Sequence, residues 1–278
     1  MARTLLKIIN AKYFFNKLIR KGTKMKWHKL AIFWVLLLTG STVTVFAGDG
    51  VEFEFTADYF GKYIWRGQNL DDDPAFQPGL SASYKGFTAG IWGSLETTDF
   101  NGNSGEFTEV DYSIDYSNDI PGIESVGFSV GAIYYDFPGT ATPGTTELYW
   151  GLSLSSPLSP SVTFYHDIDE ADGLYVSVGV GHSMENVFEL GPDVPVTMEL
   201  GASYGWGDSS YNKYYWSLND GKSNDLALSA AFPFEIGGWT VNPSLTYVTL
   251  ISDDISDTNT YGTDDDFFFV GIGLSKGF

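Results

Sequence analysis

The stretch DFFFVGIGLSKGF, residues 266–278, decides the fold class. Apolar side chains occupy alternate positions, and small residues occupy most of the positions between them. The apolar set is Phe268, Val270, Ile272, Leu274 and Phe278, and the small set is Gly271, Gly273 and Ser275. This alternation predicts a strand with one apolar face. Because an exposed apolar edge invites aggregation, we expect the closing strand of a membrane barrel, whose edge is paired and whose apolar face meets lipid.

Similar segments recur throughout the chain after residue 47. They span residues 51–65, 78–85, 87–96, 107–117, 125–136, 146–155, 161–167, 173–183, 195–205, 225–235, 239–250 and 266–278. Alternating segments of about ten residues are typical of transmembrane barrels. We therefore predict an all-β fold, an antiparallel transmembrane β-barrel of about 12 strands, with about 10 to 14 possible.

The N-terminus predicts export. Residues 25–47 combine basic residues, the apolar run 30–38 and small residues that end at Ala47, so we expect a signal peptide cut after Ala47. A membrane anchor is the alternative, but the apolar run is shorter than the ~20 residues that a spanning helix needs. Residues 1–24 form an N-terminal extension that is not translated if Met25 is the start, and residues 48–278 form the barrel.

Charge and composition exclude several classes of protein. Residues 48–278 hold six Lys and Arg against 35 Asp and Glu, a formal charge of 6 − 35 = −29, so we expect no nucleic-acid partner. The chain has no cysteine, which excludes disulfides and cysteine metal sites. Aromatic residues make up 17% of the chain, which argues against disorder. We expect no cofactor and no bound metal.

The connections between segments alternate in length. The long, polar set is 67–77, 97–106, 137–145, 207–224 and 252–265, with 168–172 as its one short member. The other set includes tight turns at 84–87 and 236–238. An even strand count places both termini with the short turns, so we expect these in the periplasm and the long loops outside the cell.

The side of the strands opposite the apolar side is rich in glycine and serine, which predicts a water-filled lumen. The alternative is that inward Trp92, Tyr149, Tyr165 and Tyr175 pack over the glycines. The same phase collects charge, and its members are Glu52, Glu54, Asp58, Lys62, Arg66, Glu96, Glu109, Asp111, Asp115, Glu147 and Glu199. Nine carboxylates against two cations predict a pore lining with a preference for cations. Plain solvated lumen residues are the alternative.

Arg66 and Lys62 share a face of the first predicted strand with Asp58. This spacing predicts a cluster at a rim or constriction, in which lumen carboxylates hold the guanidinium group. The cluster either braces the barrel or grips an anionic group of a solute.

Acidic clusters occur at 71–73, 167–172 and 264–266. They are either solvated loops or sites for divalent cations that bridge to lipopolysaccharide phosphates. The other partners that we expect are outer-membrane lipid and the barrel-assembly machinery, with Phe278 as the assembly signal, and the sequence leaves the oligomeric state open.

Histidine use argues against an enzyme. His166 and His182 are the histidines after residue 47, they lie far apart, and both fall in the lipid-facing phase. We therefore predict no catalytic residues. A set of His166, Asp167 and a serine near the outer rim is the alternative. Aromatic residues at segment ends predict interface girdles, and these are Tyr63, Trp65, Phe107, Trp206, Trp216, Trp239 and Phe278. Residues 214–216 also allow a loop-packing cluster or a platform for a sugar or receptor.

Residues 58–94 resemble the TorF-type family of outer-membrane porins. The resemblance is carried by an aromatic-Arg-Gly step, a Pro-Ala-x-Gln step and a Gly-aromatic-x-Ala-Gly-x-Trp-x-Ser hairpin, which include Trp65, Arg66, Gly67, Pro74, Ala75, Gln77, Gly90 and Trp92. The resemblance implies a Gram-negative outer-membrane porin. We expect a channel for passive diffusion of small hydrophilic solutes, neutral or cationic. The alternative is a non-conducting structural or adhesive barrel with acidic surface loops.

Overall fold

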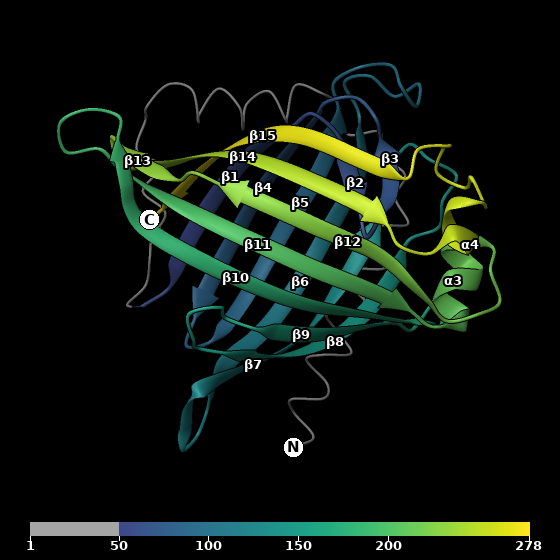
Figure 1. Cartoon of the computed structure of the whole chain (residues 1–278), viewed down its shortest axis with the longest axis horizontal. Coiled ribbons are helices and arrows are strands. Elements are labelled where there is room, and N and C mark those ends of the chain that lie inside the picture. The colour runs from purple at the N-terminus through teal and green to yellow at the C-terminus, as the bar shows by residue number, and fades with distance from the viewer. Residues whose placement is uncertain (1–49) are drawn as a thin grey trace, which may run out of the picture. The chain divides into compact units, whose positions relative to one another are not determined.

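A computed structural model describes residues 50–278, which form one closed antiparallel barrel. Its main sheet contains thirteen strands, of which twelve form the wall and one, β13 (Phe234–Ile236), is a short segment between two wall strands (Figure 1). Each wall strand pairs with its neighbours along the chain. The first pairs with the last, which closes the barrel. The predicted fold class is therefore confirmed.

The wall strands agree closely with the predicted segments. They are β1 (Glu52–Phe60), β4 (Ala75–Tyr84), β5 (Phe87–Glu96), β6 (Phe107–Ile120), β7 (Ile123–Asp136), β8 (Thr145–Leu154), β9 (Ser161–Asp167), β10 (Leu174–Glu189), β11 (Pro195–Gly207), β12 (Lys222–Ala231), β14 (Trp239–Leu250) and β15 (Asp266–Gly277). All twelve predicted strands are present. The tight turn between β4 and β5 uses Lys85 and Gly86, both with positive φ, which suits a two-residue hairpin turn.

The outer face of the wall is apolar, as the alternation predicts. In β15, Phe268 is 63% exposed and Val270 54% exposed, whereas Phe267, which has the opposite phase, is buried. Other half-exposed outer residues include Leu148, Trp150 and Leu152 of β8. A continuous apolar band of this kind is suited to contact with lipid tails. No helix between residues 50 and 278 is long and apolar enough to cross a membrane.

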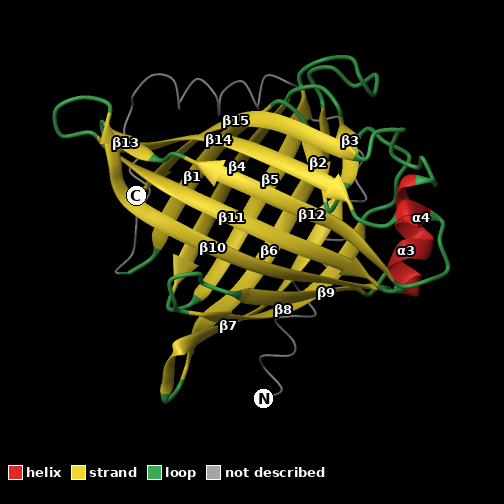
Figure 2. Cartoon of the chain, in the orientation of Figure 1, coloured by secondary structure: helices red, strands yellow, loops and turns green. Residues whose placement is uncertain are grey.

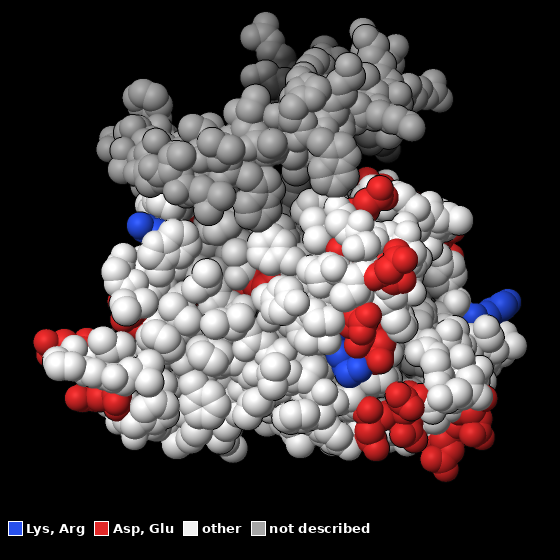
Figure 3. Space-filling view, turned by 90° about the horizontal axis from the view of Figure 1, so that it is seen from above, with Lys and Arg blue, Asp and Glu red and all other residues white. Residues whose placement is uncertain are grey.

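Charge gathers away from this band. On the face that Figure 3 shows, most acidic side chains lie toward the barrel end that carries the long connections, and the wall between the ends is almost free of charged groups. Lys276 is the cation near the end of β15, and its Nζ lies 5.3 Å from the ring centre of Trp239 and 5.5 Å from that of Phe278. This cluster has the composition of a membrane–water interface.

The predicted end of the first strand is wrong. It was expected to reach residue 65, but β1 ends at Phe60, and residues 63–71 form a separate hairpin of β2 (Tyr63–Trp65) and β3 (Gln68–Asp71). The Arg66-Gly67 pair has φ values of 51° and 81° and reverses the chain in two residues, so residues 63–71 fold back on themselves as a hairpin instead of continuing along the wall. The predicted long loop 67–77 is therefore mostly strand, because β4 already begins at Ala75.

Two helices lie in the long connections at the same end of the barrel (Figure 2). Helix α3 (Ser209–Trp216) begins after Asp208, whose side chain accepts a hydrogen bond from the Tyr211 backbone N–H. Helix α4 (Asp253–Ser256) is a single turn. The only cluster of buried apolar side chains in the described part of the chain joins Tyr175, Tyr211, Trp216 and Ile255, so the core sits at the long-loop end.

Candidate functional site in the barrel lumen

The β2–β3 hairpin brings Arg66 into the lumen. Gly67 is required at its turn for two reasons: its φ is positive, and a Cβ there would lie 2.7 Å from Leu250 Cδ2. The turn is therefore held against the wall without space for a larger residue. Its Arg66 side chain is only 9% exposed.

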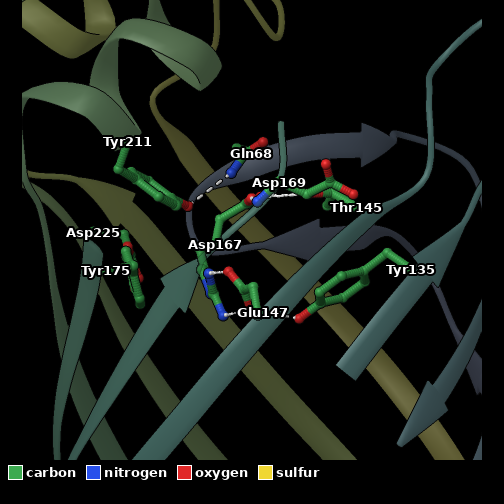
Figure 4. A network of polar contacts seen from close by, with 10 residues as sticks. Gln68, Tyr135, Thr145, Glu147, Asp167, Asp169, Tyr175, Tyr211 and Asp225 are labelled. Atoms are coloured by element: carbon green, nitrogen blue, oxygen red, sulfur yellow. Dashed lines mark hydrogen bonds and ion pairs between the residues drawn. The ribbon is translucent and has the colours of Figure 1, made fainter. Parts of the chain in front are cut away.

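Glu147 holds the Arg66 guanidinium group with both carboxylate oxygens. The distances are 2.7 Å from Nη1 to Oε1 and 2.8 Å from Nη2 to Oε2. The Tyr135 hydroxyl donates a third hydrogen bond to Glu147 Oε2 at 2.8 Å, and Figure 4 shows Glu147 between Tyr135 on one side and Tyr175 on the other. A forked, charge-assisted pair of this kind fixes both position and orientation.

Aromatic rings surround the same guanidinium group. The Cζ of Arg66 lies 4.3 Å from the ring centres of Trp65 and Tyr165 and 4.5 Å from that of Tyr175. Cation–π contact is strong for a cation that water does not reach. Burial lowers the pKa of Arg66, but the Glu147 carboxylate together with Tyr135 and Tyr211 raises it, so the pKa lies well above its usual value and the group stays charged.

A second layer of contacts covers the hairpin. Gln68 Nε2 donates to the Tyr211 hydroxyl at 3.1 Å, which connects β3 to α3 (Figure 4). Asn212 on α3 donates to the Gly207 carbonyl and accepts from Asn224, so the helix is bonded to two wall strands. We call the hairpin and α3, residues 63–71 and 209–216, the plug. Its buried, hydrogen-bonded side chains occupy the long-loop end of the lumen.

The other half of the lumen is open and lined by small polar groups. A cavity of about 410 Å³ lies between β6, β7, β8 and β9. Its lining is Ser117, Asn118, Asp119, Gly127, Phe128, Ser129, Gly151, Leu152, Ser153, Ser161 and Thr163. We call this cavity the chamber. Hydroxyl groups lie directly over its glycines, since a Cβ on Gly151 would meet Thr163 Oγ1 at 3.0 Å and Ser129 Oγ at 3.1 Å.

The expected aromatic packing over glycine occurs only beyond the chamber, toward the plug. A Cβ on Gly131 would lie 2.5 Å from the Tyr149 hydroxyl, and a Cβ on Gly205 would lie 2.0 Å from the Tyr175 hydroxyl. Both alternatives for the lumen are therefore realised, each in a different half of the barrel.

The predicted cluster of Arg66, Lys62 and Asp58 does not form. Arg66 pairs with Glu147, and Lys62 bonds to the carboxylate and the carbonyl oxygen of Asp72, because the chain leaves the wall after Phe60. Asp58 stays on β1, where its Oδ1 would lie 2.5 Å from a Cβ on Gly273. The expectation that a lumen carboxylate holds the guanidinium group agrees with the fork to Glu147.

The other candidate pore residues divide between the two halves. Glu96 and Glu109 are buried near the plug; Glu96 accepts from Asn101, and Glu109 neighbours the Tyr63 hydroxyl. Asp111 also lies near Tyr63, while Asp115 accepts a hydrogen bond from Tyr149 at 2.7 Å. Three further candidates are exposed and lie toward the short-turn end, namely Glu52, Glu54 and Glu199.

The acidic loop clusters are not uniformly solvated. Asp71 and Asp167 are buried, and Asp167 accepts from the Thr145 hydroxyl at 2.8 and 2.9 Å. Asp172 and residues 264–266 are exposed. Between residues 50 and 278, no three His, Asp or Glu side chains are arranged to hold a metal ion. The idea of cation bridges to lipopolysaccharide therefore stays a prediction.

The girdle prediction is wrong for Trp216, which is 1% exposed, and for Trp65, which packs on Tyr135 and Tyr215 inside the barrel. The loop-packing alternative for residues 214–216 is the one that the buried cluster supports. The sequence also missed Tyr135 and Tyr211 as partners of the hairpin, and Gln68 as the hairpin residue that bonds to Tyr211. The alternation of β7 places Tyr135 inward, so the sequence did indicate that this side chain faces the lumen. The residues of α3 follow no strand alternation, so the sequence held no comparable signal for Tyr211.

His166 and His182 both lie on outward phases of β9 and β10. Tyr165 on β9 and Tyr175 on β10 have the opposite phase to these histidines and contact Arg66 inside the barrel. His166 Nε2 lies 3.8 Å from Asp172, which is exposed, and His182 Nδ1 lies 2.6 Å from the Pro157 carbonyl oxygen. Neither histidine faces the lumen, so they cannot form a catalytic set there.

The residues that carry the porin resemblance also build the hairpin and the adjoining part of the wall. Trp65, Arg66 and Gly67 make the hairpin turn, and Pro74 and Ala75 follow the hairpin into β4. Two other residues of the resemblance lie on the wall strands β4 and β5 beside the hairpin. Gln77 donates to Ser94 at 3.3 Å, and Trp92 packs on Tyr63 of the hairpin. Gly90 faces Ser113, whose Oγ would lie 2.8 Å from a Cβ.

Fold and site together define a porin-like barrel of twelve strands whose lumen is filled at one end. The sequence model of the Gcw_chp family, described as bacterial proteins of unknown function, matches residues 47–232. The chain belongs to this family. The TorF-type assignment rests on residues 58–94 and stays a prediction.

Solved structures with a similar fold include outer-membrane proteins. The NanC porin is 11% identical, with 81% of this chain and 98% of the porin covered and a TM-score of 0.46. LpxR from Salmonella typhimurium is 8% identical, with coverages of 80% and 99% and a TM-score of 0.49. An outer-membrane channel from Pseudomonas putida F1 is 8% identical, with coverages of 82% and 96% and a TM-score of 0.41. No curated protein matches the chain.

Proposed function

We propose that the protein is an outer-membrane channel for small hydrophilic solutes, neutral or cationic, and that the plug keeps its long-loop end shut at rest. The observation that carries the proposal is the chamber, about 410 Å³ of space inside the wall, lined mostly by hydroxyl groups and glycine backbone. A barrel that serves only as a scaffold gains nothing from such a void, because filled interiors are more stable.

Lumen charge supports the cationic preference. The inward carboxylates outnumber the inward cations, and Arg66, the cation deepest in the plug, is already neutralised by Glu147. A solute in the lumen therefore meets a negative potential, which concentrates cations. We also propose export by a cleaved signal peptide at 25–47, which lies outside the described residues, and assembly through Phe278.

The test is planar-bilayer recording of the full chain, expressed in a Gram-negative host and purified in detergent, beside its Arg66→Ala variant. We expect small or intermittent currents from the wild type and larger currents from the variant. The reversal potential across a salt gradient should indicate cation preference. Folding is checked independently by the heat-dependent mobility of the barrel on gels.

The second candidate is a non-conducting barrel whose acidic loops serve adhesion or envelope stability. Its specific support is the plug itself, whose buried hydrogen bonds would also suit a permanently closed barrel. Silence from both folded proteins favours this candidate and overturns the channel. Currents with anion preference overturn only the proposed selectivity.

A further inference from the structure

The wall supplies the carboxylate and two ring faces of a recognition site for a guanidinium group, and the chain's own Arg66 occupies it. Glu147 of β8 supplies the fork, and Tyr165 of β9 and Tyr175 of β10 supply two ring faces at 4.3 and 4.5 Å from Arg66 Cζ. Tyr135 of β7 orients the carboxylate through its 2.8 Å hydrogen bond. All four residues belong to adjacent wall strands, so the site does not depend on the hairpin for its shape.

The geometry selects for guanidinium over other cations. Two parallel N–H···O bonds of 2.7 and 2.8 Å match a planar fork, which an ammonium group cannot supply. Ring faces on a buried, planar cation add stacking that a strongly hydrated ammonium ion loses. The wall site also holds a second carboxylate besides Glu147, the partner of Arg66. Asp225 accepts a hydrogen bond from the Tyr175 hydroxyl at 2.8 Å.

The occupant is tethered to the wall rather than built into it. The hairpin departs after Phe60 and returns at Ala75, and its own Trp65 completes the ring set around Arg66. A tethered ligand has a high effective concentration at its site, so the hairpin remains seated unless a competing ligand replaces it. Displacement of Arg66 would remove Trp65 and the turn from the lumen together.

We propose that Glu147, Tyr165 and Tyr175 form a binding site for solutes that carry a guanidinium group, and that Arg66 is a resident substitute ligand whose displacement unplugs the barrel. The proposal deepens the channel function proposed above, because it names the solute class and the step that opens the lumen. The site itself is independent of conductance.

The experiment removes the tethered ligand and supplies a free one. We titrate methylguanidinium chloride into the purified full-length Arg66→Ala variant by calorimetry, with methylammonium chloride at equal ionic strength as the comparison ligand. We expect methylguanidinium to bind at least about tenfold more tightly than methylammonium. The double variant Arg66→Ala with Glu147→Gln should lose this preference. Lys62→Ala is the matched control, because it removes a cation that lies next to the hairpin and pairs with Asp72, and it creates no empty site around Glu147.

In bilayers, methylguanidinium should reduce the current of Arg66→Ala and leave the current of the double variant unchanged. Binding without any current supports the site and contradicts the channel, so the two proposals fail separately. Absence of binding to folded Arg66→Ala, or equal binding of both ligands, overturns the site. If Arg66→Ala does not fold, Arg66→Gln keeps the length of the side chain without its charge and is titrated in the same way with the same deciding outcomes.

Discussion

The two halves of the lumen have the same wall and opposite contents. Toward the short turns, inward positions carry serine, threonine and glycine around a cavity of about 410 Å³. Toward the long loops, the same inward phase carries Tyr135, Glu147 and Tyr175, and the plug occupies the space between them. The wall repeat therefore does not decide whether a barrel is open. Side-chain size and one inserted hairpin decide it.

The largest effect is expected from removal of Glu147, the wall carboxylate that holds Arg66 of the plug. Glu147→Ala leaves the buried Arg66 charge without its fork, and loss of one partner of a buried pair costs about 3–5 kcal/mol. Urea unfolding in detergent should report this loss, and bilayer currents should rise as the hairpin loosens. Glu199→Ala is the control, since Glu199 is inward but exposed, and it should change stability by less than about 0.5 kcal/mol. Equal stability of the two variants would contradict the assigned role of the fork.

A pair of glycine substitutions compares packing in the two regions. Gly205→Ala places a Cβ 2.0 Å from the Tyr175 hydroxyl and should destabilise the barrel by about 1–3 kcal/mol, because Tyr175 must move off Arg66. Gly181→Ala meets nothing closer than 3.7 Å and should be nearly neutral. Unfolding midpoints of both variants measure the contrast. A neutral Gly205→Ala would mean that the long-loop half is loosely packed.

Asp71 at the end of the hairpin should make the plug sensitive to pH. Burial raises the pKa of Asp71 to about 6 from a usual value of 3.8, so the folded state prefers the protonated form. The stability that this preference contributes is present at low pH and is lost as pH rises through about 6. Wild type should therefore lose about 1 kcal/mol relative to Asp71→Asn between pH 4 and pH 7. Parallel unfolding curves across that range would refute the prediction.

The smallest expected effect concerns the chamber. Ser129→Tyr should change stability by less than about 0.5 kcal/mol yet reduce the current of an unplugged Arg66→Ala barrel, because the new ring fills part of the chamber. Val130→Tyr on the same strand is the control, since Val130 is 49% exposed on the outer face and its ring would meet lipid. If both substitutions reduce the current equally, the chamber is not on the conduction path.

Most of the wall could be predicted because each strand's pattern is local. Period-two alternation identified all twelve strands and the outward phase of His166, since side chains alternate across a strand whatever its neighbours are. The errors fall where the chain leaves this period. The first wall strand ends at Phe60, and the Arg66-Gly67 turn makes residues 63–71 a separate hairpin; α3 lies in a polar connection whose cap, Asp208, carries little information without its helix.

The sequence by itself determined the strands, their inward and outward faces, and the excess of carboxylates inside, because these properties depend on residues one or two positions apart. Only the tertiary structure decided that Arg66 meets Glu147, 81 residues further along the chain, and that its hairpin turns into the lumen. Closure of the barrel sets which inward residues face one another across it, and no local pattern encodes that meeting. The plug is therefore a product of the closed barrel.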